Sequence, residues 1–484
     1  MRIFSMATSI VIAITTGAHA ELTSSEVEID FQQPPPSVAA AMEPSVVTLS
    51  DTEVDRIEKI GGYALIDGYP YYQYWQLGDA NSWVRHPSAL GGAMYALFKN
   101  NRGRLPELID EAMKTAVSLR NGGLTWFYPE VYPLSRMVGP KVHYSALSQS
   151  TLLAATMHMA RADHKKYEPL LRRVAKGIEY DYHQGGVLWQ KGVFLELPLF
   201  YSPPEIILNG WLHALLNYGD YVTEFPNLEN RAIWNRNIRY LVDLLPSFDD
   251  PENRISLYSN TTPLHLRVLS DSVPTRVDYV PLDKRFPKYS VSLREMEAPE
   301  INGVRKDSPF DTQITSRKGA ATLVRATCNA LYETRIVSTK PIQASYSRGL
   351  YDPLKASPPR GEQVMLLEGR PLGDGSYVVS FNAKTPGVFC GYPTNFAKPG
   401  NRNLYHAYHV VALAYLGEHP FVNPKQRAVL VDFARRWDSY TREREASGDR
   451  FYEYANVLSL INKHKLLRRR VDWEKLRSLT IDSH

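Results

Sequence analysis

The sequence contains few of the residues and motifs that mark metal or nucleotide chemistry. Only two of its 484 residues are cysteine, Cys328 and Cys390, and no CxxC pair or closely spaced Cys/His set is present. This pattern predicts no metal site. The GxSxG, HExxH and P-loop motifs are also absent from the sequence. We therefore expect a protein that uses no cofactor. An oxidising compartment would permit a disulfide between the two cysteines.

Long apolar runs are scarce as well. The clearest run extends from Ile3 to Ile14, follows a single early arginine, and ends shortly before Ala18-His19-Ala20, an A-x-A cleavage pattern. It is too short for a membrane-spanning helix, which needs about 20 apolar residues. Residues 1–20 are therefore predicted to be a signal peptide, with an uncleaved N-terminal anchor as the alternative. We expect a secreted or periplasmic protein without stable membrane insertion after cleavage.

Charge and aromatic content favour a carbohydrate ligand over nucleic acid. The formal net charge of +5 is a mild excess, which suits a polyanion without requiring one. No zinc-finger or RRM signature is present, and we expect no nucleic-acid partner. Tyrosine is abundant, with 30 Tyr against 16 Phe. Aromatic rings with a polar tip are common in sugar-binding clefts, although composition alone does not separate this use from ordinary surface tyrosines.

The order of helical and β-rich patterns predicts an α+β multi-domain protein, with an α/α-toroid-like helical domain and an inserted β-sandwich-like module. The expected parts are a signal peptide (1–20), an extended linker rich in Pro, Ser and acidic residues (21–55), a first helical part (56–268), a β-rich module (269–398) and a helical completion (399–484). Three consecutive domains, with a separate C-terminal bundle, are the alternative arrangement.

Hydrophobic periodicity places the individual elements. The predicted helices cover residues 86–100, 106–119, 145–162, 167–180, 209–221, 230–245, 406–415, 424–440 and 452–467. The predicted strands cover residues 321–326, 331–338, 363–367 and 376–382.

Four segments hold side chains suited to chemistry. They are His143–Gln149 (HYSALSQ) at a helix start, Glu196–Gly210 (ELPLFYSPPEIILNG) in a proline-rich loop, Phe248–Tyr258 (FDDPENRISLY) after a helix, and Leu404–His409 (LYHAYH) at another helix start. In this order they resemble the C-terminal helical domain of the heparosan/heparan sulfate D-glucuronyl C5-epimerases. That family has WYSAMAQG-like, EYP…VLNG, (T/S)-I-Y and DYHTTH-like segments. The closing stretch Phe433–Tyr440 is similar to the family's F-x-x-R-W-x-x-Y ending.

The resemblance implies an enzyme that removes the C5 proton of a glucuronate residue and returns a proton to the opposite face. By position in the motifs, Tyr258 and Tyr405 are the implied acid/base pair. The tyrosine of the family's EYP motif is replaced by Leu197, so Tyr201 is the candidate for a third catalytic tyrosine. An arginine that follows the (T/S)-I-Y tyrosine in the family is missing after Tyr258.

The missing positive charge has three candidate sources, Arg254, Arg267 and Arg402. Candidate substrate-binding residues are Asn209, Tyr144, His143, Gln149, Glu196, Arg254, Arg402, His406 and His409. Several of the candidates have a plainer reading. In it, Tyr258 is a packed residue after a helix, and Tyr405 with His406 is a helix-start cluster without chemistry. Asn209 is then only an N-cap, His143 a structural residue, and Glu196 a loop anchor.

Three functions remain open on this evidence. The first is C5-epimerisation of a uronate-containing acidic polysaccharide. The second is a polysaccharide lyase, which begins with the same proton abstraction and then eliminates the C4 substituent. The third is a non-catalytic polysaccharide-binding or assembly protein, which the missing tyrosine and arginine favour. A homodimer is left open.

Overall fold

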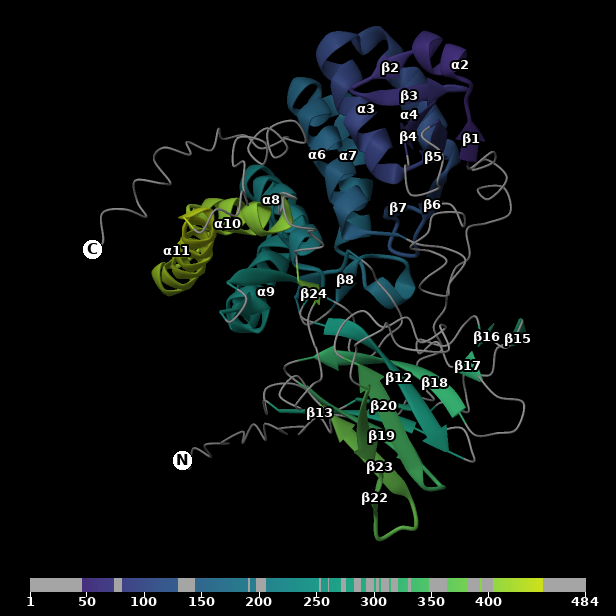
Figure 1. Ribbon diagram of the computed structural model, residues 1–484. Helices are drawn as coiled ribbons and strands as arrows, with labels where there is room; N and C mark the ends of the chain where they lie inside the picture. The colour runs from purple at the N-terminus through teal and green to yellow at the C-terminus, as the bar shows by residue number, and fades with distance from the viewer. Residues whose placement is uncertain are drawn as a thin grey trace, which may run out of the picture.

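The computed structural model describes residues 46–73, 81–128, 144–189, 192–196, 206–251, 254–259, 261–270, 276–282, 289–292, 300–301, 304–305, 313–314, 321–329, 332–347, 364–381, 392–393 and 404–446. The predicted signal peptide, the predicted helix 452–467, Cys390 and the side chain of Cys328 lie outside this description. The mixture of helix and sheet that the sequence predicts is confirmed, with the helices in one half of the molecule and the long strands in the other (Figure 1).

The helices are α2 (Asp51–Arg56), α3 (Pro87–Asn100), α4 (Leu105–Lys114), α6 (Ala146–Ala162), α7 (His164–Ile178), α8 (Leu208–Glu224), α9 (Leu228–Leu244), α10 (Leu404–Gly417) and α11 (Pro424–Ala446). The longer ones follow one another as hairpins, α3–α4, α6–α7, α8–α9 and α10–α11, whose two helices contact each other. The first helices of the hairpins also form a series of contacts, α3 with α6, α6 with α8, and α8 with α10. Within the described part of the chain, every helix is too short or too polar to cross a lipid bilayer.

Contacts between the first helices show that they run in the same direction. A Cβ on Gly91 of α3 would lie 3.0 Å from Thr151 Cγ2 of α6, so these helices pack closely. Hydrogen bonds of 3.2 Å join Thr151 Oγ1 to His213 Nε2 of α8, and His213 Nδ1 to the hydroxyl of Tyr408 in α10. Each of these residues lies slightly more than one turn from the start of its helix. The N-terminal ends of α3, α6, α8 and α10 therefore lie at one end of the helical part, which we call the N-terminal end.

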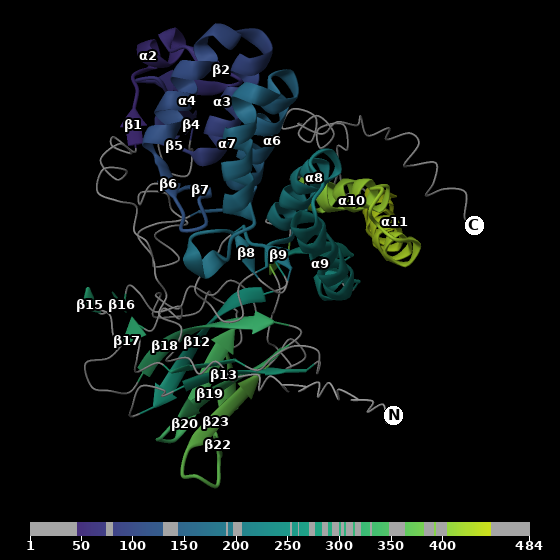
Figure 2. The same cartoon turned by 180° about the vertical axis from the view of Figure 1, so that it is seen from behind.

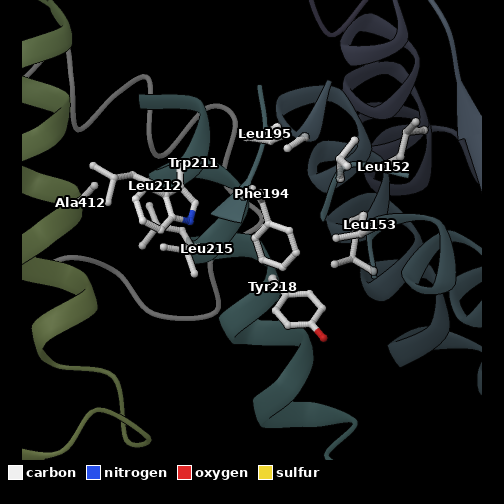
Figure 3. Close-up of a cluster of buried hydrophobic side chains, with 14 of the residues drawn as sticks. Leu152, Leu153, Phe194, Leu195, Trp211, Leu212, Leu215, Tyr218 and Ala412 are labelled. Atoms are coloured by element: carbon white, nitrogen blue, oxygen red, sulfur yellow. The ribbon is translucent and has the colours of Figure 1, made fainter. Parts of the chain in front are cut away.

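The core between these helices is apolar and fully buried. Figure 3 shows Leu152 and Leu153 of α6 facing Phe194, with Trp211 and Leu215 of α8 continuing the cluster toward α10. The indole N–H of Trp211 donates to Asn237 Oδ1 at 2.9 Å, which satisfies the polar atom of the largest side chain in this region. The packing holds the start of α8 in place relative to α6.

Short antiparallel strands surround the helices. An N-terminal sheet has the order β1 (Val46–Thr48), β5 (Ser82–Arg85), β4 (Tyr69–Gln73), β3 (Tyr63–Ile66), β2 (Lys59–Ile60). Two hairpins, β6 (Ala116–Ser118) with β7 (Leu124–Trp126) and β8 (Leu188–Trp189) with β9 (Val193–Phe194), lie between helices. A further sheet joins β10 (Asp249–Asp250), β11 (Ile255–Ser259) and β24 (Tyr392–Pro393).

The β-rich stretch between β11 and β24 forms two larger antiparallel sheets (Figure 2). The first has the order β15 (Glu300–Ile301), β16 (Val304–Arg305), β17 (Gln313–Ile314), β18 (Ala321–Asn329), β12 (Thr261–Ser270), β20 (Ile342–Ser347), β21 (Val364–Glu368). The second has the order β14 (Tyr289–Ser292), β13 (Arg276–Pro281), β19 (Tyr332–Ser338), β23 (Tyr377–Phe381), β22 (Arg370–Pro371). The two sheets contact each other through β20 and β23.

Two local expectations differ from the structure. The linker predicted for residues 21–55 does not extend that far, because β1 pairs with β5 and Ser50 caps α2 in a capping box with Glu53. The helix predicted for residues 106–119 ends at Lys114. Residues 116–118 instead form β6, and the turn at Gly122, whose φ is +79°, closes the β6–β7 hairpin.

A substitution at Gly177 of α7 would test how closely α7 packs against β7. A Cβ at this position would lie 1.9 Å from the carbonyl oxygen of Leu124 in β7. We expect Gly177→Ala to lower the free energy of unfolding by about 1–3 kcal/mol, although alanine is the better helix former. Urea denaturation measures the change. Gly373→Ala is the matched control, because its Cβ would meet nothing within 4 Å; equal effects of the two changes would contradict the packing.

Candidate functional site

The candidate site lies at the N-terminal end of the helices, where β11 runs beside α8 and α10. Tyr258 of β11 and Tyr405 of α10 are far apart in the sequence, yet their rings meet edge to face with centroids 5.1 Å apart. The Tyr258 hydroxyl donates to Glu196 Oε1 at 3.4 Å. Tyr258 is half-buried and Tyr405 is 38% exposed. We call Tyr258, Tyr405 and Glu196 the tyrosine site.

Glu196 reaches the tyrosine site because a glycine in the first turn of α8 lies beside it. A Cβ on Gly210 would lie 2.0 Å from Glu196 Oε2, so only glycine leaves room for the carboxylate there. The carboxylate is buried against the first turn of α8, where free backbone N–H groups and the helix dipole favour a negative charge. Burial raises the pKa of the neighbouring Tyr128 to about 12, and the charge of Glu196 adds to this rise.

A buried serine joins the strand of one tyrosine to the helix of the other. The backbone N–H of Ser256 donates to His406 Nδ1 at 2.8 Å, and its Oγ lies 2.6 Å from that atom and 2.8 Å from His409 Nδ1. His406 Nδ1 accepts the N–H, so its Nε2 carries the proton and donates to the carbonyl of Trp437 at 3.0 Å. We call Ser256, His406 and His409 the serine–histidine clamp.

The clamp places both histidines inside the protein. His406 and His409 are fully buried, so they fix β11 against α10. The sequence-based prediction that their nitrogen atoms bind a substrate is therefore wrong. Burial, with a smaller contribution from His406, holds the pKa of His409 well below its usual range. Within the described residues, His409 Nε2 has no hydrogen-bond partner.

Two further candidates have structural roles. The hydroxyl of buried Tyr144 donates to the carbonyl of Tyr182, and burial raises the pKa of Tyr144 far above its usual value. Gln149 is fully buried in α6 and donates to the carbonyl of Trp126 at 2.9 Å. These contacts support the start of α6 and use the Tyr144 hydroxyl and the Gln149 side-chain N–H group. Within the described residues, Gln149 Oε1 has no hydrogen-bond partner.

The sequence suggests Asn209 as the N-cap of α8, but the structure shows another residue there. The N-cap is Ile207, and Asn209 lies inside the first turn of the helix. Its side chain is buried, and within the described residues its Oδ1 has no hydrogen-bond partner. The Oδ1 atom of Asn209 therefore stays a candidate hydrogen-bond acceptor for a substrate. Asn209 lies next in the sequence to Gly210, which contacts Glu196.

Among the described residues, none of the three arginine candidates is seen to place its positive charge next to the tyrosines. Arg254 is exposed, has a φ of +51°, and forms an ion pair of 3.3 Å with Glu443 of α11. His143, Tyr201, Arg402 and the side chain of Arg267 lie outside the described residues. Among the residues that are described, no group of His, Cys, Asp or Glu is arranged to hold a metal ion.

The structure adds residues that the sequence interpretation missed. Tyr408, one turn after Tyr405, contacts His213 of α8, and burial followed by the charge of Glu196 raises its pKa far above the usual value. Tyr128 is the second such residue, because the charge of Glu196 also raises its pKa. Tyr408 could have been found from its spacing of three residues from Tyr405 on one helix face. Tyr128 lies in a short strand-to-loop segment without such a signal.

A cavity of about 440 Å³ lies away from these residues, between the start of α7 and the C-terminal end of α8. His164, Glu168, Arg172, Tyr221 and Phe225 contribute to its lining. Glu168 forms an ion pair with Arg172, so the charges of these two groups neutralise one another, and its other carboxylate oxygen lies 3.1 Å from His164 Nδ1.

Part of the chain matches a known protein family. Residues 124–277, about a third of the chain, match the family model described as D-glucuronyl C5-epimerase C-terminus. The predicted resemblance is confirmed over this stretch, which includes Glu196, Asn209 and Tyr258 and ends before Tyr405. The match indicates a uronic-acid epimerase-like role. A comparison with curated proteins finds no match.

The serine–histidine clamp predicts a stability effect. Ser256→Ala removes the Oγ shared by two buried imidazole rings, and we expect it to lower the free energy of unfolding by about 1–3 kcal/mol. Urea denaturation is the measurement. Ser439→Ala is the control, because the Ser439 hydroxyl is exposed and donates only to a carbonyl in its own helix. A loss no larger than that of the control would mean that the clamp contributes little.

The depressed pKa of His409 predicts a pH effect. Below about pH 6.5 the unfolded chain binds a proton at this histidine and the folded chain does not, so stability falls as the pH falls. The expected contribution is about 1.4 kcal/mol for each pH unit. His409→Gln should flatten the decline between pH 6.5 and pH 5 by about this amount, measured by urea denaturation at a series of pH values. Parallel curves for the two proteins would refute the assignment.

Proposed function

We propose that the protein is an exported enzyme that epimerises C5 of glucuronate residues in an acidic polysaccharide. The observation that carries the proposal is the meeting of Tyr258 and Tyr405 beside Glu196 at the starts of α8 and α10. The family match over residues 124–277 supports the same reaction class. Export is proposed from the signal-peptide pattern of residues 1–20.

The chemistry requires a base, an acid and a way to stabilise negative charge. The C5 proton lies next to a carboxylate, so its removal leaves an enolate-like species with two negative charges. Helix N-terminal ends stabilise anions through free N–H groups and the helix dipole. In the proposed complex, the substrate carboxylate lies at the N-terminal ends of α8 and α10. Arg402, two residues before α10, stays the sequence-based candidate for an added positive charge.

In the proposed reaction, Tyr258 takes the C5 proton from one face of the sugar while its own hydroxyl proton passes to Glu196. The electron pair of the broken C–H bond moves into the carboxylate group. Tyr405 then donates its hydroxyl proton to C5 from the opposite face. Tyr405 is partly exposed, so its phenolate can regain a proton from solvent, and Glu196 releases one. No atom of the polymer is lost, so the product is a stereoisomer.

We also propose an architecture that suits a polymer substrate. The parallel series α3, α6, α8 and α10 is taken as the inner layer of an α/α toroid, with α4, α7, α9 and α11 outside it. The two larger sheets are taken as a β-sandwich, since they contact each other through β20 and β23. A toroid of this kind gathers the N-terminal ends of its inner helices around one site.

Hydrogen–deuterium exchange at C5 tests the proposed reaction. In heavy water, the enzyme should introduce deuterium at C5 of glucuronate in a heparosan-type polymer. Tyr258→Phe, Tyr405→Phe and Glu196→Gln should each reduce the rate at least about 100-fold, because each removes a proton donor or acceptor. Mass spectrometry of the digested polymer measures the exchange. Tyr95→Phe is the control, since Tyr95 lies in the second half of α3, away from the tyrosine site.

Other outcomes separate the competing functions. Growing ultraviolet absorbance from an unsaturated uronate would identify a lyase. Binding of acidic polymers without exchange or cleavage would identify a binding protein. Normal exchange in the Tyr258 and Tyr405 variants would remove both tyrosines from the reaction.

A further inference from the structure

Two exposed tyrosines lie at the ends of a series of neighbouring side chains, which we call the row. Its members, in order, are Tyr405, Tyr258, Glu196, Tyr128, His86 and Tyr72. Among the described residues, the large apolar or aromatic side chains that are exposed are Tyr72 (42%), Leu228 (92%), Leu282 (48%) and Tyr405 (38%). Tyr405 begins the row at the tyrosine site. Tyr72 ends it, on β4 of the N-terminal sheet.

The row continues from Glu196 through two aromatic rings, of which Tyr128 is buried and His86 is half-buried. Tyr128 is close enough to Glu196 for the carboxylate to raise its pKa. The rings of Tyr128 and His86 meet edge to face with centroids 4.6 Å apart, and His86 contacts Tyr72 at 5.5 Å. The row therefore passes the start of α3, where His86 is the N-cap, and the start of α6, where Ser145 is the N-cap.

Tyr72 is a fixed platform. Its backbone is held in a sheet, paired with Val84 of β5, and its ring leans on His86 at an interplanar angle of 48°. Burial lowers the pKa of His86 to about 3, so its ring is neutral near pH 7. Such a platform offers a ligand an aromatic face and a hydroxyl rather than a charge, and little side-chain freedom is lost on binding.

We propose that Tyr72, supported by His86, is a distal subsite on which a sugar ring of the acidic polysaccharide stacks. The inference rests on the proposed function, because that function places the reacting sugar at the other end of the row. The polymer would extend from Tyr405 and Tyr258, past the starts of α8, α6 and α3, to Tyr72. Its carboxylates would then lie along helix N-terminal ends, which are complementary in charge.

Binding of heparosan oligosaccharides of increasing length tests the subsite. Short oligosaccharides that occupy only the tyrosine site should bind Tyr72→Ala and the unmodified protein equally. Oligosaccharides long enough to reach Tyr72 should bind Tyr72→Ala about tenfold more weakly, which corresponds to about 1.4 kcal/mol. Isothermal titration calorimetry gives the dissociation constants. The tenfold ratio should be the same at low and high salt, because the stacking ring and its support are uncharged.

Two further variants complete the experiment. Tyr72→Phe keeps the ring and should bind long oligosaccharides within about threefold of the unmodified protein. Leu282→Ala removes an equally exposed side chain outside the row and should change nothing. An equal loss at all lengths, no loss at any length, or no binding of any oligosaccharide would overturn the subsite. Length-dependent loss without C5 exchange would keep the subsite and reject the epimerase.

Discussion

Ser256 is buried between the imidazole rings of His406 and His409, and the relative position of Tyr258 and Tyr405 depends on this contact. Tyr258 follows Ser256 by two residues on β11, and Tyr405 immediately precedes His406 on α10. Buried polar atoms that lose their partners cost about 1–3 kcal/mol each, so the strand and the helix are stable together only in one register. The same network that stabilises the interior therefore sets the geometry of the exposed tyrosines.

The common direction of α3, α6, α8 and α10 has a related effect. Because the four helices start at the same end, the free backbone N–H groups of their first turns all lie there. Glu196 is buried beside Gly210 in the first turn of α8, where the helix dipole offsets part of the hydration that a carboxylate loses on burial. The common direction also makes one end of the helical part suited to anions, although the net charge of the whole chain is only mildly positive.

The sequence predicted the long helices because their apolar residues repeat with the helical period, and it predicted Tyr258 and Tyr405 through motif order. It did not reveal what lies between them. Their contact joins β11 to α10, and a contact over so long a sequence separation leaves no local pattern. The buried positions of His406 and His409 were missed for a similar reason, because a histidine at a helix start has the same local sequence whether it faces solvent or a buried serine. The N-terminal sheet escaped notice because its strands are short.

The pairing of β11 with β24 also has an evolutionary consequence. Leu257 lies opposite Pro393, so the chain leaves for the two larger sheets and returns at almost the same point. The entropy lost on closing such an excursion grows only with the logarithm of its length, about 0.6 kcal/mol for each doubling. The number and length of strands beyond Ser259 can therefore change greatly in descent while the distance between the two ends stays constant. A large insertion at this point is nearly neutral for the geometry of the helices that carry it.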